Sequence, residues 1–310
     1  MANVTAGMVK DLREMTGAGM MDCKKALAAT DGDMDKAVEF LREKGLAASA
    51  KKAGRIAAEG LVKTVIKDDK YAAIVEVNSE TDFVAKNAEF TSYVENVANQ
   101  ALATTAADID AFLAEPWSLD TSKTVAEELS SKIAIIGENL VIRRFAKVTA
   151  ENGCVVSYIH GGGKIGVLVE ADTDVVNDEV KECLKNVAMQ IAALNPKYTS
   201  RDEVDADFIE KEKEILMVQA KNEKPDAADK IIEGMVMGRI NKELKEICLL
   251  DQTYVKAEDG KQTVAAYVKE ASKNAGANLT IKKFVRFETG EGIEKKEENF
   301  AEEVAKQMGM

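Results

Sequence analysis

One stretch of the sequence has the residue types of a phosphate-binding loop, the run HGGGK at residues 160–164. Glycines let backbone N–H groups surround an anion, and a lysine adds positive charge. A P-loop, however, has the spacing G-x-x-x-x-G-K-[ST] and leads into a helix, whereas Lys164 is followed by the strand-like run IGVLVEAD. We therefore interpret residues 160–164 as a glycine-rich hairpin turn.

The residues needed for metal or covalent chemistry are few and scattered. The cysteines form no C-x-x-C pair, and the only histidine is His160. This pattern supports neither a zinc site nor a disulfide framework, and it favours four buried or reduced thiols, at Cys23, Cys154, Cys183 and Cys248. An acyl- or phosphoryl-transfer enzyme would need a titratable constellation that is missing here. We expect no enzymatic activity, no cofactor and no bound metal.

The segment NSETDFVAKN, residues 78–87, has two interpretations. In the first it is an ordinary helix entry, with Thr81 or Asp82 as the cap and Phe83 packed into the core. In the second, Phe83 protrudes between carboxylates and Lys86 and enters a crevice of a partner, because buried aromatic side chains often dominate binding. The residues alone leave both interpretations open.

The composition restricts the class of partner. The formal net charge is −12, which argues against a general nucleic-acid surface and favours a protein partner. The amino terminus lacks a signal-peptide pattern, and no run reaches the ~18 apolar residues of a membrane span, so we expect a soluble, cytoplasmic protein. Only three prolines and few aromatic residues among 310 predict an α-rich α+β fold of two or more units.

The first unit, residues 1–55, is expected to be a bundle of three helices. Thr5 is a plausible cap, Gly17 and Gly19 separate the first two helices, and the third begins at Asp33 and ends before Gly45. A linker of small residues, AASAKKAGRIAAEG, follows at residues 47–60. So small a bundle is marginal alone and suits docking.

The middle of the chain looks duplicated. Residues 56–145 form one expected α+β subdomain, and residues 146–199 with 247–290 form another, each with an antiparallel sheet. The alignment places Thr81 on Thr173 and Asn96 on Asn186, and it makes the first copy two residues longer just after Asp82. An added segment at a strand-to-helix junction is a favourable place for function.

Two further segments complete the predicted architecture. Residues 200–246 indicate an antiparallel helical hairpin, inserted into the second subdomain, with a turn near Asn222 to Pro225. Its apolar residues either seal the two arms together or meet a second subunit: Ile209, Ile215, Leu216, Ile231, Ile232, Met235 and Val236. Residues 291–310 form a charged C-terminal module, with few apolar anchors, that is expected to be a docking helix.

Four separated blocks resemble the elongation factor Ts family, in order and across nearly the whole chain. They are TAGMVKDLREMTGAGMMDCKKAL at 5–27, VNSETDFVAKN at 77–87, IGENLVIRR at 136–144 and FETGEGIEKKEENFAEEVA at 287–305. The resemblance implies an N-terminal ubiquitin-associated-like bundle, a core of two subdomains, an inserted coiled-coil hairpin and a C-terminal module. It also implies a guanine-nucleotide exchange factor that binds GDP-bound elongation factor Tu.

The resemblance assigns roles to particular residues. The segment Thr81, Asp82, Phe83 and Val84 is expected to dislodge Mg²⁺ from elongation factor Tu, with Phe83 as the wedge. The bundle is expected to contact the partner's nucleotide-binding domain, and His160 to contact a further domain. The expected bundle contacts are Arg13, Met20, Met21 and Lys24.

The small bundle taken alone also fits a different class, a ubiquitin-like-binding or scaffold protein. The sequence leaves a homodimer through the helical hairpin open. A scaffold should not accelerate GDP release from elongation factor Tu, so that assay separates the two classes.

Overall fold

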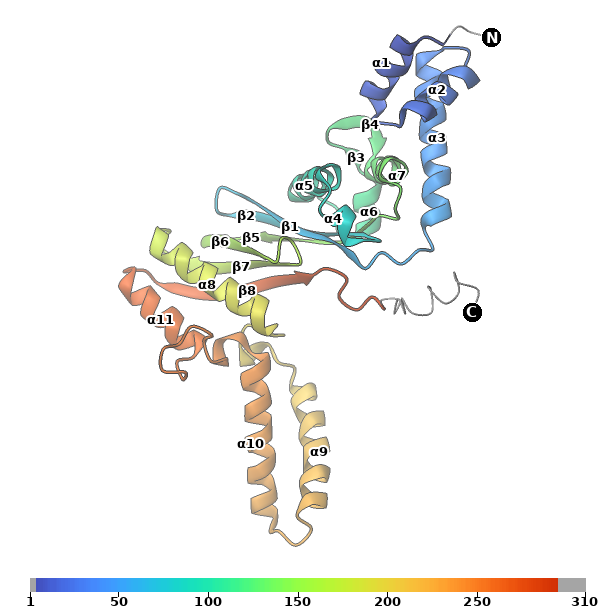
Figure 1. Cartoon of the computed structure of the whole chain (residues 1–310). Helices are drawn as coiled ribbons and strands as arrows, with labels where there is room; N and C mark the ends of the chain where they lie inside the picture. The colour runs from blue at the N-terminus through green and yellow to red at the C-terminus, as the bar shows by residue number, and fades with distance from the viewer. Residues whose placement is uncertain (1–3, 295–310) are drawn as a thin grey trace.

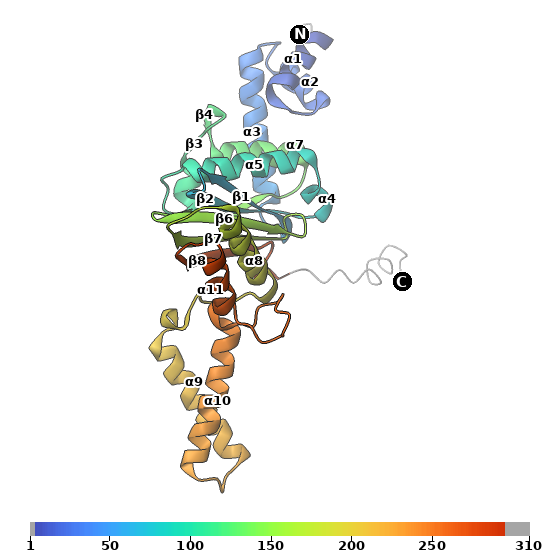
Figure 2. The same cartoon turned by 90° about the vertical axis from the view of Figure 1, so that its left-hand side faces the viewer.

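The computed structural model describes residues 4–294 and confirms the α+β class. A helical bundle lies at one end, two antiparallel sheets with their helices lie in the middle, and a helical hairpin projects at the other end (Figures 1 and 2). The expected C-terminal docking helix falls mainly on residues 295–310, which lie outside the described residues.

Three helices form the N-terminal bundle, α1 (Ala6–Thr16), α2 (Met20–Ala29) and α3 (Met34–Lys52). Thr5 caps α1 by accepting a hydrogen bond from the Met8 N–H, and Gly17 ends α1 in the left-handed conformation. Asp33 caps α3. A small apolar core holds the three helices together: Val9, Leu12, Cys23, Ala26, Leu27 and Ala37.

The predicted end of the third helix before Gly45 was wrong, because α3 continues to Lys52 through part of the supposed linker. Gly45 faces α7 (Val125–Ile136), where a Cβ atom would lie 3.6 Å from the Ser130 carbonyl oxygen. Lys52 Nζ donates to the Ile133 carbonyl at 3.3 Å. Packing of small residues against α7 thus outweighs the low helix propensity of glycine.

The first sheet has the order β1-β2-β5 and is antiparallel throughout. Its strands are β1 (Glu59–Lys67), β2 (Tyr71–Ser79) and β5 (Val141–Thr149). The single-turn helix α4 (Asp82–Ala85) follows β2, and α5 (Ala88–Ala103), α6 (Ile109–Ala114), the hairpin β3 (Pro116–Trp117) and β4 (Asp120–Thr124), and α7 come next. Apolar residues of α5, α6 and α7 pack on one face of the sheet and form a core.

The second sheet has the order β6-β7-β8, with β6 (Gly153–His160), β7 (Ile165–Thr173) and β8 (Leu279–Glu288). The helices α8 (Asp178–Leu194) and α11 (Val264–Asn274) bury their apolar faces on it. Short 3₁₀ turns lie at Arg201–Glu203 and Leu249–Asp251.

The glycine-rich segment is a hairpin turn between β6 and β7, as predicted. Gly161, Gly162 and Gly163 all have positive φ, which glycine adopts readily. The Gly163 carbonyl accepts a hydrogen bond from the Val62 N–H at 2.7 Å, and a Cβ atom at Gly163 would lie 2.6 Å from Leu61 Cδ2. The positive φ angles of the turn account for Gly161 and Gly162, and close packing on β1 also accounts for Gly163.

The two sheets lie against each other and share a third apolar core. Gly166 of β7 is essential to this approach, because a Cβ atom there would lie 2.4 Å from Val62 Cγ1 on β1. The residues of the shared core come from both sheets: Val62, Ala72, Ile74, Val148, Ala150, Val155, Leu168 and Phe287. The sheets therefore form one layered core between the bundle and the hairpin.

The helical hairpin consists of α9 (Ala206–Glu223) and α10 (Asp229–Ile247) and projects away from the sheets (Figure 1). Leu216, Ile232 and Val236 are buried in its seam, which agrees with the first of the two alternatives, whereas Ile215 and Ile231 are exposed. The seam is a separate core, which also includes Tyr198 and Cys248 at its base.

Removing residues 201–246 and joining the ends by a short Gly/Ser bridge should leave the remaining chain folded. Tyr198 and Cys248 form a β-bridge, so the cut ends lie side by side, and the seam shares no core with the sheets. Circular dichroism should show a cooperative thermal transition, and light scattering should report whether any dimer depends on the hairpin. An unfolded remainder would mean that the hairpin belongs to the core.

All four cysteines are buried and free, as predicted. Burial raises the pKa of the Cys183 thiol to about 11, and it also raises the pKa values of Cys154 and Cys248. A buried thiol with a raised pKa is a poor nucleophile, so these three thiols serve packing.

Candidate partner-binding site

The helical turn α4 presents the segment Thr81–Val84 at the end of β2. The Thr81 hydroxyl accepts a hydrogen bond from the Val84 N–H at 3.4 Å and so caps the turn. Asn87 caps the next helix, α5, by accepting from the Glu89 N–H at 2.8 Å. A cap at either end therefore isolates α4 as a short turn between a strand and a helix.

Phe83 is 80% exposed, which is the largest exposure among the large apolar residues of the described chain. Ala85 of the same turn is buried, and Val84 packs against the core beneath the first sheet. The interpretation of Phe83 as a core residue was therefore wrong, because Val84 and Ala85 anchor the turn instead. A phenyl ring that is 80% exposed packs little against the described residues, whereas an aromatic side chain is a favourable anchor in a partner's pocket.

The exposed ring is flanked by opposite charges. Asp82 Oδ2 accepts a hydrogen bond from Lys86 Nζ at 2.7 Å. This bond lowers the pKa of the Asp82 carboxyl, and the charge of Lys164 acts in the same direction while that of Glu59 opposes it. Asp82 thus remains an anion at neutral pH, placed next to Phe83.

His160 is exposed at the end of β6, and its Nδ1 lies 3.0 Å from the Tyr158 hydroxyl. Lys164, at the other end of the same turn, forms an ion pair with Glu59 of β1. Since α4 also contacts β1, the turn of the second sheet lies near α4. The structure thus brings the turn after His160 toward the segment Thr81–Val84.

The predicted contacts of the bundle are also exposed. Met20 and Met21, in the first turn of α2, are 60% and 62% exposed, and Arg13 and Lys24 are exposed as well. They lie in the bundle, apart from α4, in both views (Figures 1 and 2). A partner that uses both regions must therefore span the distance between the bundle and the first sheet.

The hydrogen bonds of the two sheets correct the predicted alignment of the duplicated segments. Ser79 Oγ donates to the Thr81 carbonyl at 3.0 Å, and Thr173 Oγ1 donates to the Val175 carbonyl at 2.8 Å. Ser79, not Thr81, is therefore the counterpart of Thr173. The strand register supports the same alignment, because Gly60 pairs with Asn78 in the first sheet and Gly153 pairs with Asp172 in the second.

This alignment changes the size of the added segment. Seven residues separate Ser79 from the cap Asn87, whereas three separate Thr173 from the cap Asn177. The first junction is thus four residues longer, and the predicted excess of two was wrong. Since α4 has four residues, the added segment corresponds to one helical turn, and Phe83 has no counterpart after β7.

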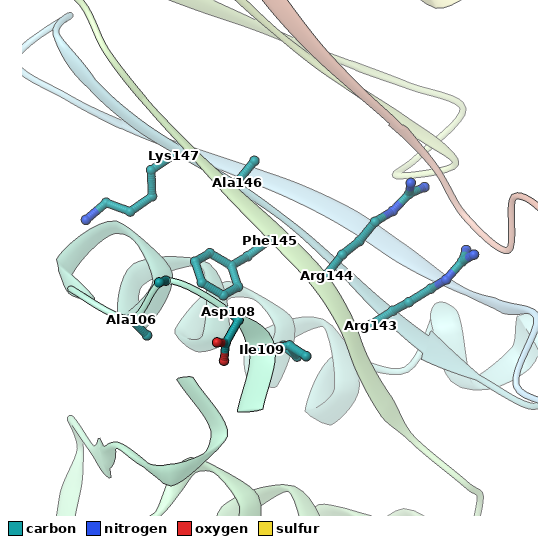
Figure 3. A pocket seen from close by; sticks show the side chains of 9 residues that line it. Ala106, Asp108, Ile109, Arg143, Arg144, Phe145, Ala146 and Lys147 are labelled. Carbon is teal, nitrogen blue, oxygen red and sulfur yellow. The ribbon is translucent and has the colours of Figure 1, made fainter. Parts of the chain in front are cut away.

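A cavity of about 380 Å³ lies beside β5 (Figure 3). Arg143 and Arg144 extend to one side, where both bind the Glu76 carboxylate, and Lys147 extends to the other, where it donates to the Thr104 carbonyl. Asp108, in the same cavity, caps α6. Each of these charged groups already has a partner, so the cavity offers no free acid, base or nucleophile.

The described residues contain no group of three or more His, Cys, Asp or Glu side chains that could hold a metal ion. Within residues 4–294, no helix is both long and apolar enough to cross a bilayer. The exposed segment Thr81–Val84 and the exposed bundle residues thus remain the leading features for function.

Comparison with known proteins shows the family. The family model described as "Elongation factor TS" matches residues 80–291, more than half of the chain. Proteins named "Elongation factor Ts" are 57% identical over 308 residues in Clostridium botulinum (strain Eklund 17B / Type B) and 58% identical over 309 residues in Clostridioides difficile (strain 630). These matches cover 99% of this chain and 99% and 100% of the two relatives. The chain belongs to the elongation factor Ts family.

Proposed function

We propose that this chain is the guanine-nucleotide exchange factor for elongation factor Tu in translation elongation. Family membership supports the role and the partner. The observation that carries the proposal is the exposed Phe83, which is 80% accessible on a helical turn that is anchored from below by Val84 and Ala85.

Exchange requires that the factor and GDP disfavour each other on the same partner, each weakening the other by the same factor. The factor need not touch GDP. In the proposed mechanism the GDP-bound partner takes up Phe83 between its own elements, and the Thr81–Val84 segment displaces the parts that hold Mg²⁺. Loss of a divalent cation from the phosphate oxygens removes a large attraction, so GDP leaves and GTP can bind.

The proposed domain organisation follows the separate apolar cores. Residues 1–55 would be the ubiquitin-associated-like bundle, residues 56–145 the first core subdomain, and residues 146–199 with 247–290 the second. The hairpin at 200–246 would be an insert, and residues 291–310 a C-terminal module. The cores of the bundle, the first sheet and the second sheet support this division, and the shared core joins the two sheet subdomains.

The bundle would supply a second contact with the partner through Met20 and Met21, next to Arg13 and Lys24. Replacing Met20 and Met21 together by Ala should weaken binding to elongation factor Tu roughly tenfold, because exposed thioethers adapt well to an apolar partner surface. The melting temperature should barely change, since both side chains are more than half exposed. Calorimetry measures the affinity, and an unchanged affinity would contradict this role.

The direct test of the proposed function is GDP release from purified elongation factor Tu. An exchange factor should accelerate release at concentrations far below those of the nucleotide complex, whereas a scaffold or ubiquitin-like-binding protein should leave the rate unchanged. The factor acts here by binding and forms no covalent intermediate, so we propose a non-enzymatic role. Absence of any acceleration would contradict the proposal.

A further inference from the structure

Glu138, in the loop between α7 and β5, contacts the start of α4 through both carboxylate oxygens. Its Oε2 accepts hydrogen bonds from the N–H groups of Glu80 and Thr81, at 3.1 and 3.0 Å. Its Oε1 accepts from the Thr81 hydroxyl at 2.6 Å. The same hydroxyl oxygen accepts from the Val84 N–H, so Glu138 is linked through Thr81 to the first turn of α4.

A second set of bonds joins the same two segments, and it occurs in both halves of the core. The Asn139 N–H donates to Glu80 Oε1 at 2.5 Å in the first half. The Asn278 N–H donates to Asp174 Oδ1 at 2.7 Å in the second. In both halves of the core, therefore, a hydrogen bond fastens the junction after the middle strand.

Glu138 is different, because only the first half has it. The run Gly137-Glu138-Asn139-Leu140 before β5 corresponds to Gly276-Ala277-Asn278-Leu279 at the start of β8. Where the second half has Ala277, the junction after β7 forms no helical turn before α8. The carboxylate and the turn that bears Phe83 thus occur together in one half and are both missing from the other.

We propose that Glu138 is the positioning residue that holds α4, and hence Phe83, in the exposed orientation; this rests on the proposed exchange function. A single helical turn is unstable by itself, because nucleation fixes several residues for few hydrogen bonds. Hydrogen bonds from backbone N–H groups to a carboxylate are stronger than neutral ones and suit the start of a helix. Glu138 acts through Thr81 and needs no contact with the partner.

The test compares Glu138→Ala with the wild-type chain in two measurements. Hydrogen exchange on the free chain should show faster exchange confined to residues 80–86. Stimulated GDP release from elongation factor Tu should slow roughly tenfold, since an exposed turn that samples many orientations inserts Phe83 less often. Glu138→Gln retains one acceptor and the shape of the side chain. In both measurements, its rate should therefore lie between those of the wild type and Glu138→Ala.

The double variant Glu138→Ala with Phe83→Ala separates positioning from an independent contact. If Glu138 acts through Phe83, the double variant should be no slower than Phe83→Ala alone. Asp174→Ala is the control, because Asp174 is the counterpart of Glu80 and its loss removes a junction carboxylate from the second half, where no turn exists. It should leave stimulated release unchanged.

Several outcomes would overturn the proposal. One is that residues 80–86 of Glu138→Ala exchange hydrogen as slowly as those of the wild type. Another is that these residues exchange faster, yet Glu138→Ala stimulates GDP release at the wild-type rate. Loss of protection across the whole first sheet would assign Glu138 to the fold instead. If the wild-type chain itself fails to stimulate release, the exchange function fails, while the protection of residues 80–86 still decides whether Glu138 holds the turn.

Discussion

Phe83→Ala should slow stimulated GDP release roughly 30- to 700-fold, which corresponds to about 2–4 kcal/mol for an anchor side chain at an interface. The stability of the free chain should change by less than about 0.5 kcal/mol, because the ring is 80% exposed and contributes little to the core. Truncating a buried phenylalanine would instead cost about 3–5 kcal/mol. Fluorescent GDP release and thermal melting measure the two quantities.

Val176→Ala is the matched control for Phe83→Ala. Val176 is 43% exposed and lies between Thr173 and Asn177, at the junction of the second half that lacks the added turn. The neighbouring Val175 packs against the core of the second sheet, so it is unsuitable as a control. Val176→Ala should spare exchange, so an equal defect in both variants would show that exposed apolar side chains in general, not Phe83, are responsible.

Glu76→Ala should lower the free energy of unfolding by about 3–5 kcal/mol, the cost of removing one partner from a buried ion pair. Glu76 is completely buried in β2, and it accepts hydrogen bonds from Arg143 Nη1 at 3.0 Å and Arg144 Nε at 2.6 Å. The Gly290 N–H also donates to it, at 2.8 Å. The arginine side chains are about 30% exposed, so partial rehydration places the expected loss near the lower end.

Urea denaturation followed by circular dichroism measures this loss. Glu14→Ala is the control, because Glu14 forms an exposed pair with Lys10 at 3.7 Å on α1. Such pairs contribute about 0.3–0.5 kcal/mol on helices, so the control should be nearly as stable as the wild type. If Glu76→Ala were equally stable, the buried carboxylate would not hold β2, β5 and the Gly290 turn together.

The sequence predicted local elements well where their signals are local. Thr5 caps the first helix and Gly17 ends it, as their residue types require. The hairpin seam also follows from the periodicity of its apolar residues. These predictions depend on neighbours in the chain, which the sequence displays.

The errors arose where distant contacts decide. Gly45 lies inside α3 because α7 packs against it, and a small residue is needed there. The exposure of Phe83 depends on which residues of α4 reach the core, and Val84 and Ala85 take that place. Neither fact is visible in the local sequence pattern, because each depends on contacts with residues distant in the chain.

The role of Glu138 was missed for a related reason. It lies in the block IGENLVIRR, which resembles the family, but its hydrogen bonds join residues 57 and 58 positions apart in the chain. The comparison of Gly137-Glu138-Asn139-Leu140 with Gly276-Ala277-Asn278-Leu279 was available as a signal. Without the sheet register, however, the correct alignment of the two halves was not evident.

The most direct test of the mechanism is the dependence of stimulated GDP release on Mg²⁺. Release of fluorescent GDP from purified elongation factor Tu is measured with saturating wild-type chain or Phe83→Ala, first in excess Mg²⁺ and then after chelation of the metal. If Phe83 acts by displacing Mg²⁺, GDP release in excess Mg²⁺ should be much faster with the wild-type chain than with Phe83→Ala. Once the metal is removed, the release rates with the two chains should converge. A difference of the same size under both conditions, or wild-type release by Phe83→Ala in excess Mg²⁺, would contradict the account.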